Sequence, residues 1–244
     1  MNWKNLFPKG NRYFETENGI LYYGDNAKIL KTFPKELIDA IITDPPYEIS
    51  RDNNFHTMKR NGIHFGEWDF NFNMEIWLLL DELINRNGSF VSFMAFEQYG
   101  NFIKIIDKTK LIIKDKLIWR KTNPMPRNRD RRYMADIEFC VWGVKKKAKW
   151  VFNRQNEKYE SSVTELPSEN GGGFKRYHPT QKPLKLLDKI IKIHTNEHQL
   201  ILDPFSGSGT TLVAAEKLNR RWIGIELEEK YCKIAKQRLE EVIK

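Results

Sequence analysis

Short apolar runs alternate with amphipathic stretches along most of the chain. Apolar runs predict buried strands at residues 20–23, 38–42, 89–95, 200–203 and 222–225, and longer extended stretches at 111–121 and 137–145. Helical spacing predicts helices at residues 27–33, 74–86, 97–108, 184–194, 210–218 and 228–242. The alternation of strand and helix predicts an α/β domain with a largely parallel sheet covered on both faces. The two adjoining extended stretches predict an antiparallel edge.

Several stretches show neither the helical nor the strand spacing of apolar residues. Residues 48–73 are too long for an ordinary irregular connection, and their position after a buried strand favours a lid or binding loop. Residues 121–133 contain two prolines and four arginines, so guanidinium groups are expected on a loop that can reach phosphates or base edges. A solvated run of charge is the alternative. Residues 146–177 form a short polar insert, and residues 1–18 are expected to be an arm without an assigned function.

Composition narrows the class of protein. A chain of 244 residues suits one domain spanning residues 1–244, and no repeat or linker divides it. Lys and Arg total 41 against 32 Asp and Glu, a net charge of +9 that favours a polyanionic partner. No apolar run approaches the roughly 20 residues that a bilayer requires, and the polar N-terminus is unlike a secretory signal. We therefore expect no membrane span and a cytoplasmic protein.

The cysteines and histidines do not have the spacing of a metal site. Cys140 and Cys232 fit neither zinc ligation nor a disulfide framework, and core packing in a reducing setting is expected for both. No cysteine or carboxylate stands at matching spacing to His56 or His64. We expect no bound metal.

The motif Asp44-Pro45-Pro46-Tyr47 follows the strand predicted at residues 38–42. It combines a carboxylate, two prolines that stiffen the backbone, and an aromatic ring where a strand opens into a loop. Alone, it would suit an ordinary Pro-Pro turn. A second motif far along the chain makes a functional interpretation the better one.

That second motif follows the strand at residues 200–203 and consists of Asp203-Pro204-Phe205-Ser206-Gly207-Ser208-Gly209-Thr210. Glycines let a backbone approach a ligand closely. The third glycine of the dinucleotide fingerprint is missing, since Leu212 stands there, and no phosphate-binding Gly-Lys-Ser/Thr follows. Glu226 ends the next strand, where a carboxylate can accept hydrogen bonds from both hydroxyls of a ribose. The pattern favours a nucleoside site without a pyrophosphate.

Together the two motifs resemble the S-adenosylmethionine-dependent DNA amino methyltransferases, in the beta order where Asp-Pro-Pro-Tyr precedes Asp-Pro-Phe-x-Gly-x-Gly. The resemblance covers roughly residues 21–238. It implies a Rossmann-like methyltransferase fold, a mostly parallel doubly wound sheet with an antiparallel edge. It also implies that both motifs lie at the carboxyl edge of one sheet, so that Asp44 and Gly207 converge on a shared cavity.

The resemblance assigns roles to individual residues. It implies a catalytic motif of Asp44, Pro45, Pro46 and Tyr47. For S-adenosyl-L-methionine it implies the residues Asp25, Asp44, Thr180, Lys182, Pro183, Asp203, Phe205, Ser206, Gly207, Ser208, Gly209, Thr210 and Glu226. Among these, Asp25 also suits a helix cap.

The chemistry of an exocyclic amino group explains this choice of residues. Its lone pair is delocalised into the ring, and the Asp44 carboxylate and the Pro45 carbonyl would accept its hydrogens and turn the lone pair toward the methyl donor. Tyr47 would stack on the base, which must leave a duplex to reach the site. Asp rather than Ser before Pro-Pro-Tyr favours N6 of adenine in this family, with N4 of cytosine as the alternative. Neither cysteine follows a proline, which argues against methylation at carbon 5.

Two other classes of function explain the sequence less well. A nucleotide-dependent oxidoreductase would need a pyrophosphate site, which the incomplete glycine fingerprint disfavours. A non-catalytic DNA-binding module would explain the net charge but leave Asp44, Glu226 and the glycine loop without a purpose.

DNA is the expected partner. The expected DNA contacts are Arg51, Lys59, Arg60, Asn123, Arg127, Arg129, Arg131 and Arg132. Family members have their target-recognition region at the position of residues 146–177, which are short here. This suggests a short recognition sequence, a partner subunit, or recognition shared with the loops 48–73 and 121–133. The resemblance leaves open a cognate restriction endonuclease and a homodimer.

Overall fold

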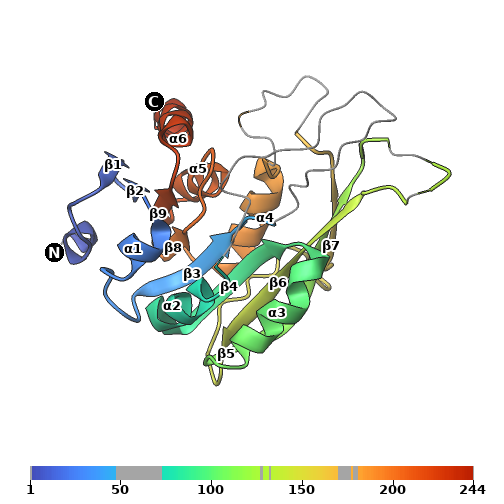
Figure 1. The fold of residues 1–244 in the computed structure, drawn as a ribbon, viewed down its shortest axis with the longest axis horizontal. Helices are drawn as coiled ribbons and strands as arrows, with labels where there is room; N and C mark the ends of the chain where they lie inside the picture. The colour runs from blue at the N-terminus through green and yellow to red at the C-terminus, as the bar shows by residue number, and fades with distance from the viewer. Residues whose placement is uncertain are drawn as a thin grey trace.

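The computed structural model describes residues 2–47, 73–126, 129–131, 133–169, 177 and 181–243, and the statements below concern these residues. One nine-stranded sheet runs through the protein in the order β1-β2-β9-β8-β3-β4-β6-β5-β7 (Figure 1). The central strands β2, β9, β8, β3 and β4 are parallel, whereas β6 pairs antiparallel with both β4 and β5. The predicted α/β fold with an antiparallel edge is confirmed.

The strands have the following bounds: β1 Arg12–Glu15, β2 Gly19–Tyr23, β3 Ile38–Thr43, β4 Ile84–Met94, β5 Leu111–Lys121, β6 Ile137–Lys145, β7 Val163–Leu166, β8 Leu200–Asp203 and β9 Arg221–Glu226. The helices are α1 Asn26–Leu30, α2 Ile76–Leu83, α3 Phe96–Ile106, α4 Leu184–His194, α5 Thr210–Lys217 and α6 Glu229–Val242, with a 3-10 turn, η1, at Trp3–Leu6. No helix among the described residues has the length and apolar character needed to cross a membrane.

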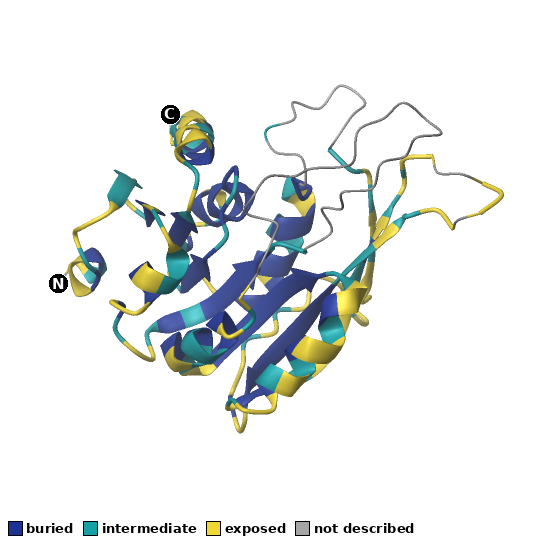
Figure 2. Cartoon of the chain, in the orientation of Figure 1, coloured by how far each residue is buried: buried dark blue, intermediate teal, exposed yellow. Residues whose placement is uncertain are grey.

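The helices cover the two faces of the sheet in separate groups (Figure 1). Helices α1, α2 and α3 pack with one face into a cluster that includes Trp77, Phe90 and Phe102. Helices α4, α5 and α6 pack with the other face into a second cluster that includes Trp142 and Trp222. The buried layer of strands between exposed helix surfaces is visible in Figure 2. Both cysteines are free and buried, as expected from their sequence context.

Some element boundaries differ from the sequence predictions. The helix predicted at residues 74–86 ends at Leu83, because Ile84 is extended, fully buried and paired with Ile38 of β3. Its apolar side chain continues the helical spacing in the sequence, which explains the error. Strands β1 and β7 were not predicted. Both are four residues long, and each pairs with only one neighbour at an outer edge of the sheet.

We expect Phe90→Ala to lower the free energy of unfolding by about 3–5 kcal/mol, because truncating a buried aromatic leaves a cavity. Phe90 is fully buried between Trp77 and Phe102, with ring centroids 5.4 and 6.0 Å away. Phe96→Ala is the control, since Phe96 is 80% exposed and its loss should cost less than about 0.5 kcal/mol. Urea unfolding measures both. Equal losses would contradict this account of the core.

Candidate active site

The two sequence motifs meet at one edge of the sheet. Strands β3 and β8 are adjacent and parallel, with Ala40 opposite Ile201 and Ile41 opposite Leu202. Their carboxyl ends are joined where the Thr43 hydroxyl donates a hydrogen bond of 2.7 Å to the Asp203 carboxylate. Asp44 and the glycine loop therefore start from neighbouring points on the sheet. The expected position of both motifs at one edge of the sheet is confirmed, whereas a cavity shared by Asp44 and Gly207 stays a prediction.

Both oxygens of Asp44 have a partner. The Tyr47 hydroxyl donates to Oδ1 at 2.6 Å, and the Lys182 ammonium forms an ion pair with Oδ2. The Gln98 amide donates to the Pro46 carbonyl at 3.0 Å and fixes the Pro-Pro turn. Burial raises the pKa of Asp44 above its ordinary value, although Lys182 opposes the shift. Burial, reinforced by the neighbouring Asp44 charge, also raises the pKa of Tyr47 well above its ordinary value, so Tyr47 is a neutral donor.

Lys182 lies between two carboxylates. Only 5% of its side chain is exposed, and its ammonium is also 3.2 Å from Glu138 on β6. Lys121, at the end of β5, forms a 2.6 Å ion pair with the other oxygen of Glu138. Burial alone would lower the pKa of Lys182, but Asp44 and Glu138 raise it. The sequence prediction had Lys182 as a cofactor residue, and its observed partners are these acids; a cofactor contact stays a prediction.

Glu138 and Lys121 were not identified from the sequence, although the alternation of residues along β6 indicates a buried position for Glu138. Glu138 alternates along β6 with Cys140 and Trp142, which are both buried. Since alternate residues of a strand share one face, this spacing directs Glu138 toward the interior. A carboxylate on the buried face of a strand usually has a charged partner.

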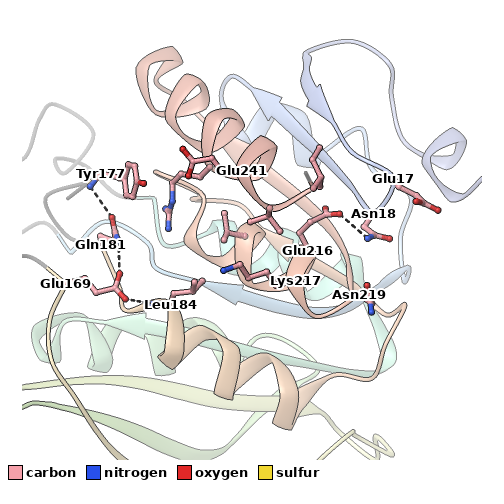
Figure 3. A pocket seen from close by; sticks show the side chains of 14 residues that line it. Glu17, Asn18, Glu169, Tyr177, Gln181, Leu184, Glu216, Lys217, Asn219 and Glu241 are labelled. Carbon is pink, nitrogen blue, oxygen red and sulfur yellow. Dashed lines mark hydrogen bonds between the residues drawn. The ribbon is translucent and has the colours of Figure 1, made fainter. Parts of the chain in front are cut away.

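The segment before α4 holds Lys182 in position. Gln181 donates to Glu169 at 2.8 Å, and Glu169 also accepts a hydrogen bond of 3.0 Å from the backbone N–H of Leu184 (Figure 3). Glu169 thereby satisfies a backbone donor in the first turn of α4, which Pro183 precedes as the N-cap residue. The predicted cofactor residue Thr180 lies outside the described residues.

The glycine loop is tied to the end of β9. The backbone N–H of Gly207 donates to Glu226 Oε2 at 2.8 Å, and that of Glu228 donates to Oε1 at 2.7 Å. Asp203 is buried beneath the loop and accepts from the backbone N–H of Phe205 at 3.1 Å, and burial raises its pKa to about 6. Asp203 thus links the two motifs, while its expected contact with the cofactor stays a prediction.

The pKa of Glu226, at the end of β9, is raised above its ordinary value. Burial raises its pKa to about 7, even though two backbone N–H groups favour its ionised form. Asp25 lies in the connection between the neighbouring strand β2 and α1, and its carboxylate caps α1 by accepting from the backbone N–H of Lys28 at 3.2 Å. The helix-cap interpretation of Asp25 is confirmed, and its contact with a cofactor stays a prediction.

Arg238 of α6 supports the glycine loop from the side of the helices. Its guanidinium donates to the Ser208 carbonyl at 2.7 Å and to the hydroxyls of Ser208 and Thr210 at 3.2 and 3.0 Å. The Ser206 hydroxyl donates to the Ile225 carbonyl at 3.0 Å. These hydroxyls make hydrogen bonds within the protein, and the cofactor contacts of Ser206, Ser208 and Thr210 stay predictions.

Arg238 also borders an open pocket of about 1040 Å³ between α4, α5 and α6 (Figure 3). Its guanidinium lies 4.6 Å from the ring centroid of Tyr177, which also lines the pocket. The spacing of Tyr231, Ala235 and Arg238 puts all three on the buried face of α6, a signal from which the sequence could have identified this arginine.

The expected DNA contacts are only partly described. Arg129 and Arg131 are exposed on the connection between β5 and β6. Asn123 binds within the protein, since its side-chain amide donates to the Ser168 carbonyl at 3.1 Å and accepts from the Ser168 N–H at 2.6 Å. The remaining residues lie outside the described ranges: Arg51, Lys59, Arg60, Arg127 and Arg132. All of these contacts stay predictions, as does the role of residues 48–73 as a lid.

We expect Gly209→Ala to lower the free energy of unfolding by about 2–4 kcal/mol. Gly209 has φ +78°, and an added Cβ would lie 2.8 Å from the Cβ of Ala235, so backbone strain and overpacking both contribute. The control is Gly100→Ala, at a position in α3 with open space, which should stabilise the helix by about 0.5–1 kcal/mol. Urea unfolding of the two variants should move in opposite directions. A neutral Gly209→Ala would contradict the described packing.

Comparisons with known proteins agree with this geometry. The family model N6_N4_Mtase, described as DNA methylase, matches residues 38–237. The chain is 33% identical over 254 residues to the Type II methyltransferase M2.LlaDCHI of Lactococcus lactis subsp. cremoris, covering 93% of this chain and 91% of that protein. It is 35% identical over 248 residues to the Type II methyltransferase M.HinfI of Haemophilus influenzae, covering 90% of this chain and 67% of that protein.

The fold is also similar to a solved structure, the crystal structure of the M1.HpyAVI-SAM complex. The TM-score is 0.70 with 43% sequence identity, covering 90% of this chain and 98% of that chain. The match to the family model and the two curated relatives together show the family. The chain belongs to the S-adenosylmethionine-dependent DNA amino methyltransferases that its sequence motifs resemble.

Proposed function

We propose that this protein transfers a methyl group from S-adenosyl-L-methionine to the exocyclic N6 amino group of adenine in a short DNA sequence. The observation that carries the proposal is the Thr43–Asp203 hydrogen bond, which joins the start of the Asp44 motif to the start of the glycine loop. An amino group held by Asp44 and a cofactor held by the loop would then share one edge of the sheet. The aspartate before Pro-Pro-Tyr supports adenine rather than cytosine as the target.

Catalysis rests on position and charge rather than on a covalent intermediate with the protein. The Asp44 carboxylate and the Pro45 carbonyl accept the two amino hydrogens, which gives the nitrogen more tetrahedral character and directs its lone pair out of the ring plane. Tyr47 stacks on the base, worth about 1–3 kcal/mol per base by analogy with other base–aromatic contacts. In a half-buried site these interactions act on developing charge with little competition from water.

The residues around the loop suit the cofactor. Glu226 accepts hydrogen bonds from the backbone N–H groups of Gly207 and Glu228, one on each carboxylate oxygen. Each oxygen has two lone pairs, so acceptor capacity is left for ribose hydroxyls. Gly207 has φ +51°, a conformation that glycine adopts readily, and because glycine has no side chain the backbone can approach a ligand closely. When bound, the cofactor would supply an electrophilic methyl group, and its sulfur would keep the electron pair of the broken C–S bond when the methyl group passes to the nitrogen. The nitrogen then releases one proton to solvent by way of Asp44.

The proposed setting is the cytoplasm, where the protein would protect DNA against a cognate restriction endonuclease. The type II methyltransferases among its relatives support this setting. Exposed Arg129 and Arg131 would contact the DNA backbone, and a homodimer is the proposed assembly.

Modification-sensitive sequencing of DNA from a host that expresses the protein tests the proposal. We expect N6-methyladenine at one recurring short sequence. In cells that express Asp44→Ala the mark should fall by at least about 100-fold, because the amino group loses its charged acceptor. Calorimetry should still detect cofactor binding by the purified variant.

The possible outcomes are distinct. Methylation of cytosine at N4 would overturn the choice of base and retain the chemistry. Unchanged methylation by Asp44→Ala would overturn the catalytic assignment.

Cofactor affinity should depend on pH through Glu226. Its folded-state pKa is about 7, and its ionised form is the better acceptor for ribose hydroxyls, so the dissociation constant should fall as the pH rises from 6 to 8. In Glu226→Gln the affinity should drop by about tenfold and this part of the pH dependence should disappear. Glu229→Gln removes an exposed acid that pairs with Lys233 and is the matched control. Parallel profiles for wild type and Glu226→Gln would exclude this role.

A further inference from the structure

The mechanism above leaves Glu138 without a role, although this acid lies at the centre of the charged cluster. Glu138 is on β6, two strands from β3 in the sheet order, and its carboxylate extends toward the site. One oxygen pairs with Lys121 at 2.6 Å, and the other lies 3.2 Å from the ammonium of Lys182. The same ammonium is bound to Asp44. Lys182 is therefore shared between a catalytic acid and an acid outside the reaction.

The second oxygen of Glu138 is an available acceptor. Oε2 is buried and has no hydrogen bond of good geometry among the described residues, even though the Lys182 ammonium is close enough for one. A small rotation of the lysine would complete this bond. The ammonium also lies 5.1 Å from the ring centroid of Tyr47 and 4.9 Å from that of Phe93, so aromatic rings border its site. The favourable motion of the Lys182 ammonium is therefore between the carboxylates of Asp44 and Glu138.

The reaction itself requires such a motion. In the described structure Oδ1 of Asp44 already accepts from Tyr47 and Oδ2 pairs with Lys182. An arriving amino group must compete with the ammonium for Asp44. As the nitrogen takes the methyl group it becomes positively charged, and a lysine ammonium still bound to Asp44 would repel that charge. Methyl transfer is therefore faster if the Lys182 ammonium leaves Asp44 before the methyl group is transferred.

We propose that Glu138 is a positioning residue that takes the Lys182 ammonium from Asp44 when the target amino group binds. In the free enzyme Lys182 neutralises the half-buried Asp44. In the substrate complex the ammonium rests on Glu138, and Asp44 is free to hold the amino group. This inference rests on the proposed methyl transfer, but it holds for adenine or cytosine.

Lys121 keeps Glu138 suited to this task. Burial alone would raise the pKa of Glu138, but Lys182 and Lys121 outweigh it and hold that pKa below its ordinary value. Glu138 therefore remains ionised when Lys182 turns toward Asp44. A neutral acid at this position would attract the ammonium far less.

Steady-state kinetics of Glu138→Gln tests the proposal, with transfer of labelled methyl groups to DNA as the assay. We expect kcat to fall about tenfold, within the usual range of coupling between neighbouring charges, and the KM for S-adenosylmethionine to change less than about twofold. Glu165→Gln is the control, because it removes an exposed acid that pairs with Arg120 at 3.0 Å on the same edge of the sheet. This control should be as active as wild type.

The pH profile separates positioning from a merely structural role. The charged or titratable groups that face Asp44 are Lys182, Glu138, Tyr47, Asp203 and the buried thiol of Cys140. Removing the negative charge of Glu138 favours the ionised form of Asp44, so the acid limb of kcat should move to lower pH in Glu138→Gln while the plateau falls. A loss of folded protein would lower the plateau and leave the limb in place.

A double-mutant cycle gives the second readout. In a Lys182→Met background the ammonium is absent, so adding Glu138→Gln should change kcat less than twofold. A tenfold effect in both backgrounds, or wild-type kcat in Glu138→Gln, would overturn the proposal. If wild type transfers no methyl group to DNA, the proposed function fails instead, and the two failures are thereby distinguished.

Discussion

The pairing of β3 with β8 is the constraint on which the site depends. Two segments 160 residues apart in sequence become neighbours because both strands are short, apolar and parallel, and the Thr43–Asp203 hydrogen bond closes the pair at its carboxyl end. Burial of both partners protects that bond from water. Because backbone pairing fixes the register, the loops that follow the strands have little freedom in where they begin. The site is therefore positioned by the core of the sheet, and side chains only refine it.

Charge is the second organising feature. The basic groups Lys121 and Lys182 alternate with the acids Glu138 and Asp44 across the ends of β5, β6 and β3, and each buried charge has an opposite charge beside it. Isolated, any of these groups would be costly to desolvate. The alternation allows the Asp44 carboxylate to occupy a half-buried position, where the hydrogen bonds that it makes are strong. Among the described residues, Glu226, with its raised pKa, is held instead by backbone N–H groups.

Much of the fold could be predicted because, in most elements, the spacing of apolar residues and the residues that end a helix or strand indicate the same structure. The helix at Leu184–His194 and the extended stretches at Leu111–Lys121 and Ile137–Lys145 have the expected bounds. Strand β7 has the sequence Val-Thr-Glu-Leu, without alternation of apolar and polar residues, and it pairs along the edge of β5. This pairing is a tertiary cause that the local pattern does not contain. The motif residues were identifiable because each stands beside its strand in the sequence. The cluster of Lys121, Glu138 and Lys182 was not, because three separate elements contribute to it.

In the complex, we expect a base held by the first motif to face a cofactor held by the second. A crystal structure with DNA and a non-reactive analogue of S-adenosylmethionine tests it most directly. The account predicts the target amino nitrogen within hydrogen-bonding distance of Asp44, the analogue against Gly207 and Glu226, and the reactive centre of the analogue directed at that nitrogen. A flipped base bound away from Asp44, or an analogue bound elsewhere than the glycine loop, would contradict it.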